Sequence, residues 1–97
     1  MDGSLGEIIY SKAGRDCGRQ FIITGIIDND YVLISDGDYR RVEKAKKKKV
    51  KHIKFTGLVV ESIKEKTENQ VRIANAEIRK ALNSHQGEMQ NIEKSKT

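Results

Sequence analysis

Residues 19–35, RQFIITGIIDNDYVLIS, contain two short apolar segments separated by a turn, and this stretch decides the fold class. Arg19 to Ile27 and Tyr31 to Ser35 are rich in β-branched and aromatic residues, which favour strands. Residues 28–30 read Asp-Asn-Asp, and both residue types accept the left-handed backbone angles that tight hairpin turns require. The stretch therefore predicts an antiparallel β-hairpin.

Three further segments extend this hairpin. Ile8 to Tyr10 precedes it, Tyr39 to Val42 follows a second turn at residues 36–38, and His52 to Val60 alternates in strand fashion after a run of lysines. Five short strands are too few for a two-sheet sandwich. They suit a small closed barrel, which also removes exposed sheet edges.

The hydrophobic period changes in the second half of the chain. Thr67 and Gln70 form the S/T-x-x-E/Q pattern of a capping box, which marks the start of a helix. Apolar residues then recur at helical spacing and form one stripe, made of Val71, Ala74, Ile78, Ala81 and Leu82. Ile73 falls opposite the stripe. We predict one helix over residues 67–84, packed on the barrel.

The expected architecture is mostly β, with a five-stranded barrel over residues 1–66 and the C-terminal helix over residues 67–84. Residues 85–97 are polar and aperiodic, so we expect a disordered tail there. Ninety-seven residues make one small domain, and we expect a monomer.

Composition limits what the domain can do. Hydrophobic residues make up 36% of the chain, with two Phe, three Tyr and no Trp, so we expect no large cavity and no small-molecule substrate. The N-terminus lacks a basic segment followed by an apolar one, and no apolar run is long enough to span a bilayer. A single cysteine, Cys17, excludes an internal disulfide and agrees with a reducing compartment. We expect a soluble, cytoplasmic protein without a membrane partner.

Catalytic and metal-binding interpretations find little support. His52 lies in a basic stretch and His85 in the expected tail, so neither has a carboxylate and a nucleophile arranged around it. The aspartates within residues 28–30 and 36–38 lack the further ligand and the glycine of an EF-hand loop, so we interpret them as turn residues. One cysteine and two distant histidines cannot form a tetrahedral zinc site. We expect no enzyme activity, cofactor or metal.

Arg40 to Lys54 is strongly basic. It carries nine lysines and arginines against one acid, Glu43, and includes the unbroken run Lys46 to Lys49, whereas the formal net charge of the whole chain is +5. Charge segregated in this way is typical of a surface that neutralises phosphates. The simpler alternative is a solvated loop. Because the run lies inside the folded pattern, we favour a basic loop that binds nucleic acid.

Residues 12–19, KAGRDCGR, form a second basic element in front of the hairpin. Gly14 and Gly18 allow a positive φ and a close approach of the backbone to a phosphate. Three donors surround them, Lys12, Arg15 and Arg19. We interpret Asp16 as a residue that orients Arg15 or forms the turn. An ordinary glycine hairpin with incidental charge is the alternative.

Residues 5–23 resemble the KOW motif of ribosomal and transcription-elongation proteins, in which a glycine-punctuated basic loop joins two strands. The segment SKAGRDCGR, followed by Asp36-Gly37 and by lysines that end in Lys51-His52, looks like the archaeal and eukaryotic large-subunit ribosomal proteins of the fourteen-e group (L14e-like) and their small bacterial relatives. The resemblance covers roughly residues 3–54. Many KOW motifs have a further glycine at the position of Phe21. This difference weakens the match to the elongation factors more than the match to the fourteen-e group. The resemblance implies an SH3-like barrel that contacts ribosomal RNA through the first loop.

We therefore expect an RNA-binding protein that recognises the backbone and shape of folded RNA, with ribosomal RNA the expected target. Base stacking should be minor, because Tyr39 is the only aromatic residue near the basic segment apart from Phe55, which we place in the core. The expected RNA contacts are Lys12, Gly14, Arg15, Gly18, Arg19, Arg40, Arg41, Lys44, Lys46, Lys47, Lys48, Lys49, Lys51, His52 and Lys54.

Other interpretations remain open. One flank of the helix, formed by Arg72, Asn75, Arg79 and Asn83, could add a weaker RNA surface, although a solvated flank is the better interpretation. Two other classes of function also fit, a DNA-binding or nucleoid protein that uses the same lysines, and a protein-interaction barrel module. The latter would need an exposed aromatic groove, for which three tyrosines supply too little.

Overall fold

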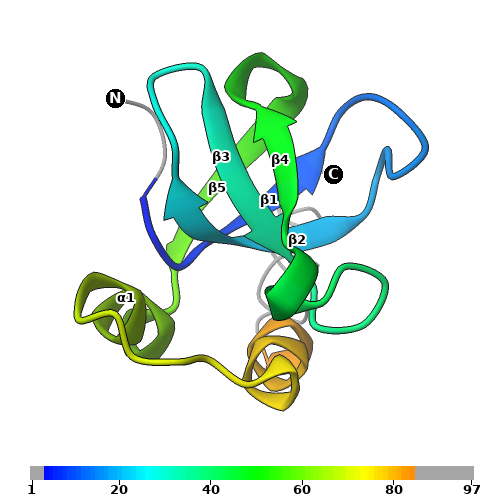
Figure 1. Cartoon of the computed structure of the whole chain (residues 1–97). Coiled ribbons are helices and arrows are strands. Elements are labelled where there is room, and N and C mark those ends of the chain that lie inside the picture. Colours follow the sequence, from blue (N-terminus) through cyan, green and yellow to red (C-terminus); the bar gives the residue numbers. More distant parts are fainter. Residues whose placement is uncertain (1–3, 85–97) are drawn as a thin grey trace.

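The computed structural model describes residues 4–84 and contains one antiparallel sheet with two helices beside it (Figure 1). The strands are β1 (Glu7–Ser11), β2 (Gln20–Ile26), β3 (Tyr31–Ser35), β4 (Lys46–Lys49) and β5 (Ile53–Val59). Short 3-10 turns, η1 (Val42–Lys44) and η2 (Val50–His52), precede and follow β4. The order across the sheet is β4-β3-β2-β1-β5, and no ladder joins β4 to β5 within residues 4–84.

The predicted hairpin is confirmed as β2 and β3, which pair from Ile22↔Ser35 to Ile26↔Val32. Its turn depends on Asp28, whose carboxylate accepts hydrogen bonds from the backbone N–H groups of Asp30, at 2.8 Å, and Tyr31, at 2.9 Å. A short aspartate side chain can accept hydrogen bonds from two amides that the turn would otherwise leave without an acceptor.

The fourth strand lies elsewhere than the sequence predicted. Tyr39 to Val42 form no strand, because residues 36–41 close a turn in which the Asp36 carboxylate accepts from the backbone amides of Asp38 and Arg40. The lysine run, expected as a loop, is β4, and it pairs along the whole of its length with β3. Lysine is uncommon inside strands but suits a sheet edge, where its charge discourages pairing with other chains.

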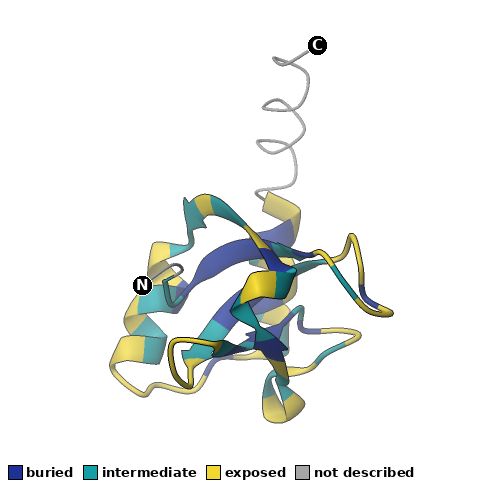
Figure 2. Cartoon of the chain, turned by 90° about the horizontal axis from the view of Figure 1, so that it is seen from above, coloured by how far each residue is buried: buried dark blue, intermediate teal, exposed yellow. Residues whose placement is uncertain are grey.

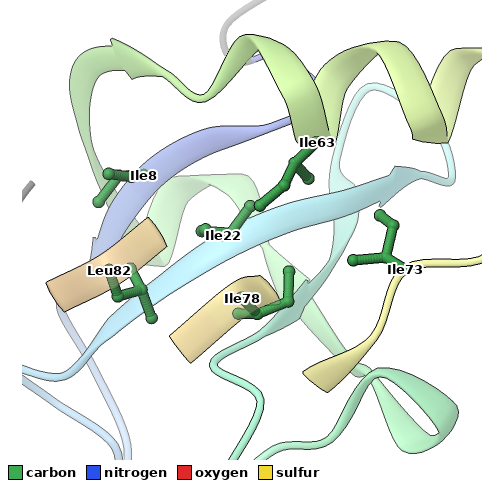
Figure 3. Close-up of a cluster of buried hydrophobic side chains, with 6 residues drawn as sticks. All are labelled: Ile8, Ile22, Ile63, Ile73, Ile78 and Leu82. Carbon is green, nitrogen blue, oxygen red and sulfur yellow. The ribbon is translucent and has the colours of Figure 1, made fainter. Parts of the chain in front are cut away.

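Consecutive residues of the central strands are buried (Figure 2). Their alternate side chains belong to two different cores, one on each face of the sheet. One core consists of Ile9, Phe21, Ile23, Val32, Ile34 and Ile53. The other lies between the sheet and the helices and consists of Ile8, Ile22, Ile63, Ile73, Ile78 and Leu82 (Figure 3). This double burial explains why β2 reads as a nearly continuous apolar run rather than an alternating one.

Two helices cover the second core, where one helix over residues 67–84 was predicted. The first is α1 (Glu61–Glu68), and the second includes residues 75–84. Between them Gln70 takes a positive φ of 58°, which ends the first helix. The break turns Ile73 into the core, where it is 6% exposed, and leaves Val71 51% exposed. The helical stripe predicted the opposite for these two residues.

The predicted capping box is also wrong. Thr67 belongs to the last turn of α1, and its hydroxyl lies at hydrogen-bonding distance from the carbonyl oxygens of Ile63, at 3.0 Å, and Lys64, at 2.8 Å. The second helix is capped instead by Glu77, whose carboxylate accepts from the N–H of Ala74 at 3.1 Å. That is the reach-back half of a capping box, shifted along the chain.

The tail expected over residues 85–97 lies outside the described residues. Within residues 4–84 neither helix combines the length and the apolar character that crossing a membrane requires.

Packing of the second helix can be tested by replacing Ile78, which is fully buried against the sheet. We expect Ile78→Ala to lower the free energy of unfolding by roughly 2–5 kcal/mol, because it removes buried methyl groups and leaves a cavity. Val71→Ala is the matched control and should change it by less than about 0.5 kcal/mol. Urea denaturation of both variants measures the difference, and equal losses would contradict the observed break between the helices.

Candidate nucleic-acid interface

The alternation of β4 divides the four lysines into two pairs. Lys46 and Lys48 lie opposite Ile34 and Val32, which belong to the core away from the helices. Lys47 and Lys49 face the other side. The side chain of Lys48 is only 7% exposed. Half of the lysine run therefore points towards the interior, where a positive charge requires a partner.

That partner is Asp16, in the middle of the first loop (residues 12–19). Its carboxylate accepts from Lys46 Nζ at 2.9 Å, from Lys48 Nζ at 3.0 Å and from the Ser11 hydroxyl at 2.8 Å. Lys48 also donates to the Ala13 carbonyl at 2.8 Å. The predicted role of Asp16 in orienting Arg15 is therefore wrong, because its charge is used to attach the first loop to β4.

Asp16 is ionised in the folded protein. The carboxylate is 1% exposed, and burial alone would raise its pKa. The hydrogen bonds from Lys46, Ser11 and Lys48 outweigh burial and hold the pKa of Asp16 well below its usual range. The first loop and β4 are thus joined by a buried, charge-assisted contact rather than by an exposed ion pair.

The first loop has the backbone that its glycines predicted. Gly14 and Gly18 take φ values of +84° and +88°, which other residues adopt only with strain. A Cβ at Gly14 would be in ordinary contact with Asp16, at 3.6 Å, and with the Lys48 ammonium, at 3.7 Å, so the positive φ rather than lack of space is what favours glycine there. Arg15, next to Gly14, stays exposed, and within residues 4–84 it forms no salt bridge. The loop presents its arginine outward while its aspartate points inward.

The base of the first loop meets η2. The Lys12 N–H donates to the His52 carbonyl at 2.8 Å, which joins the loop to the segment that follows β4. The pKa of His52 is lowered, first by burial and then by the positive charges of Lys51, Lys48, Lys49 and Lys12. His52 is therefore neutral at neutral pH and does not add to the charge that the sequence assigned to this region.

Two tyrosines lie among the basic side chains. Tyr39 has the Arg19 guanidinium 4.4 Å and the Arg40 guanidinium 5.2 Å from its ring centroid. Tyr31 has Lys47 and Lys49 above its ring, at 4.5 and 5.9 Å. The sequence placed only Tyr39 near the basic segment. It missed Tyr31 because this proximity follows from the pairing of the lysine run with β3, which a loop would not have.

The other residues that the sequence predicted as RNA contacts lie apart from the first loop and β4. Arg41 forms a salt bridge with Glu43 at 3.2 Å, and Glu43 also accepts from the Asn75 side chain at 2.5 Å. Hydrogen bonds from the Asn75 side chain and from the backbone of Glu43 itself, followed by the contact with Arg41, lower the pKa of Glu43 to about 2, so the charge of Arg41 is compensated locally. Lys44 is exposed on η1, and Lys54 is exposed on β5 opposite Tyr10.

The helix flank has a structural use. Asn75 accepts from the N–H of Val42 at 2.7 Å, and Arg79 donates to the carbonyl of Gly37 at 2.6 Å. These two residues hold the turn at residues 36–41 against the second helix. Arg72 and Asn83 are exposed.

What the structure brings together is therefore one basic edge, formed by the first loop, β4 and η2, with the turn at residues 36–41 at its end nearer the helices (Figure 1). Within residues 4–84 there is no group of three or more histidine, cysteine or acidic side chains that could hold a metal ion. The free donors on this edge are ammonium and guanidinium groups, which favour phosphates.

Comparison with known proteins finds relatives of this chain among ribosomal proteins. No protein-family model matches the chain. A large ribosomal subunit protein eL14 from Staphylothermus marinus is 34% identical over 74 residues, which make up 74% of this chain and 77% of the relative. The chain belongs to the eL14 family. An eL14 from Desulfurococcus amylolyticus is 36% identical over 52 residues, or 54% of each protein. The resemblance to the fourteen-e group is confirmed, and the Asp16 contact described above is a feature of an eL14-family chain.

The contact between Asp16 and its two lysines should stabilise this eL14-family chain. We expect Asp16→Asn to lower the free energy of unfolding by about 3 kcal/mol at pH 7, because Lys48 would keep a buried charge without a counter-charge. Asp30→Asn makes the same chemical change at an exposed turn position and should cost less than about 0.5 kcal/mol. Equal unfolding free energies for the two variants, measured in urea, would show that the buried pair contributes nothing.

Acid should remove the same stabilisation. The folded-state pKa of Asp16 lies below its ordinary value of 3.8, so its contribution is fully present above about pH 5, begins to decline as the pH falls through 3.8, and is lost completely only as the pH falls through the lower folded-state pKa. The stability difference between the parent and Asp16→Asn should therefore be constant from pH 8 to about pH 5 and shrink below about pH 4. A difference that persists unchanged at pH 3 would mean that the contact does not depend on the charge of Asp16.

Proposed function

We propose that this chain is a ribosome-associated RNA-binding protein that recognises the backbone and shape of folded ribosomal RNA. The observation that carries the proposal is the contact of Asp16 with Lys46 and Lys48, which fixes the exposed cations of the first loop beside the two outward-facing lysines of β4. The membership of the eL14 family supports it, since the relatives are proteins of the large ribosomal subunit. We also propose that the curved sheet is the SH3-like barrel of a KOW domain.

The basic edge supplies the donors for this role. Six exposed or half-exposed cations of this edge have no acidic partner within the part of the chain that is described, namely Lys12, Arg15, Arg19, Lys47, Lys49 and Lys51. They come from the first loop, β4 and η2, which are separate in sequence but joined by the contacts of Asp16 and Lys12. Cations fixed on rigid elements can match phosphates at set positions, which is how folded RNA is recognised by shape.

Lys46 and Lys48 have a different task. Both neutralise Asp16, so replacing the whole lysine run would remove the support of the first loop together with the charge. A test of the binding charge must therefore leave these two residues intact and use the outward-facing cations.

Lys51→Ser is the substitution that isolates binding charge. Lys51 is exposed on η2, so we expect unchanged stability, weaker binding to folded ribosomal RNA fragments, and a slope of log affinity against log salt that is shallower by about one. Lys80→Ser, at an exposed position on the second helix, is the matched control and should leave both affinity and slope unchanged. The measurement is a salt titration by filter binding, and affinity that does not depend on salt would contradict the proposal.

Arg15→Ala tests the first loop in a different way. We expect it to weaken binding and also to change the order of preference among several folded RNAs, because a fixed arginine in a glycine loop reads shape as well as charge. The assay compares parent, Arg15→Ala and Lys51→Ser against two ribosomal RNA fragments, transfer RNA and duplex DNA of equal length. If duplex DNA is bound as tightly as any RNA, a DNA-binding function replaces the one proposed.

A further inference from the structure

Tyr39 is a large aromatic side chain that the fold leaves 49% exposed. Two guanidinium groups lie against its ring, from Arg19 at the end of the first loop and from its neighbour Arg40. Arg19 is itself exposed, so the arginine and the ring form part of the surface. The ring therefore lies where the basic edge reaches the turn at residues 36–41.

The turn that carries Tyr39 is held from several sides. The Arg40 carbonyl accepts from the N–H groups of Asp36 and Gly37, at 3.0 and 3.1 Å, and from the Ser35 hydroxyl at 2.6 Å. The Asp36 carboxylate accepts from the N–H of Arg40 at 2.7 Å.

The second helix clamps the same turn from outside. Arg79 donates to the carbonyl of Gly37, and a side chain at Gly37 would come within 2.4 Å of the Asn75 carbonyl oxygen. Tyr39 is exposed, but the backbone that presents it is fixed. A fixed aromatic ring loses little conformational entropy when a ligand stacks on it.

A polar hollow of about 320 Å³, at the small end of the range for ligand pockets, is lined by Arg19, whose guanidinium contacts this ring, and by Asp38, the chain neighbour of Tyr39. It offers both donors and acceptors and is lined by Arg19, Gln20, Asp36, Asp38, Arg79, Leu82 and Asn83. The two carboxylates would repel a phosphate on this side, whereas the mixed lining suits the edge of a nucleobase, which carries donors and acceptors together.

We propose that Tyr39 is a stacking platform for one unpaired base of the bound RNA, an inference that rests on the proposed RNA-binding function. The base stacks on the ring and its edge faces the hollow, where Arg19 donates to the base and Asp38 accepts from it. Aromatic and guanidinium planes together form the arrangement by which proteins hold bases that are turned out of a helix. Recognition by backbone contacts along the basic edge is thus joined to one site that requires an unpaired nucleotide.

The test uses an RNA hairpin whose two strands are joined by a non-nucleotide linker, so that it has no unpaired loop bases, and compares it by fluorescence anisotropy with the same hairpin carrying one unpaired adenosine in its stem. We expect the full chain to bind the bulged hairpin about tenfold more tightly, which is the scale of one base stacked on an aromatic side chain. Tyr39→Phe should keep this preference. Tyr39→Leu, which keeps apolar bulk but loses the ring, should bind both hairpins equally.

Lys51→Ser is the control for charge and should weaken binding to both hairpins by the same factor. Equal binding of the two hairpins by the parent, or a preference that survives in a folded Tyr39→Leu, would overturn the stacking site and leave the proposed function standing. Failure of the parent to bind either hairpin or any ribosomal RNA fragment would overturn the proposed function, and the stacking site with it. Thermal melting shows that each variant is folded.

Discussion

A buried aspartate between two lysines is the interaction on which the basic edge depends. Without Asp16, Lys46 and Lys48 would carry two positive charges towards a core of isoleucine, valine and phenylalanine side chains. With it, the charges are compensated, and the first loop is fixed over β4. Removing one member of such a group costs far more than an exposed ion pair contributes, because the remaining charge stays buried.

The same lysine run serves two purposes because successive side chains of a strand point to opposite faces of the sheet. Lys46 and Lys48 are structural, whereas Lys47 and Lys49 lie over Tyr31 on the other face. A row of lysines on an edge strand also protects that edge from pairing with other chains. The charge that is proposed to bind RNA therefore also helps to keep the sheet from aggregating.

Much of the sheet could be predicted from the sequence, because the hairpin signals are local. Residues 28–30 form the predicted turn, the strand at residues 31–35 has its predicted bounds, and Gly14 has its predicted positive φ. The resemblance to the fourteen-e group rests on the same local features, and the similarity to known eL14 proteins confirms it.

The errors arose where distant contacts override local preference. Lysine has a low intrinsic preference for strands, so only the pairing with β3 and the distant Asp16 make residues 46–49 a strand. Val71 fits the helical stripe, but the chain breaks at Gln70 and buries Ile73 instead. In the candidate site, the positive φ of Gly14 and Gly18 was predicted and is confirmed, whereas the RNA contacts stay predictions. The inward direction of Lys48 was missed, because one residue of register decides which face of a strand a side chain takes.

The most direct test of this account is the affinity of Asp16→Asn for folded ribosomal RNA, measured where the variant is fully folded. The substitution removes a negative charge, so attraction by bulk charge alone predicts tighter binding. Asp30→Asn adds the same charge at an exposed position and serves as the reference. If Asp16 organises the basic edge, Asp16→Asn must bind several-fold more weakly than Asp30→Asn despite their equal net charge. Equal or tighter binding by Asp16→Asn would contradict the account.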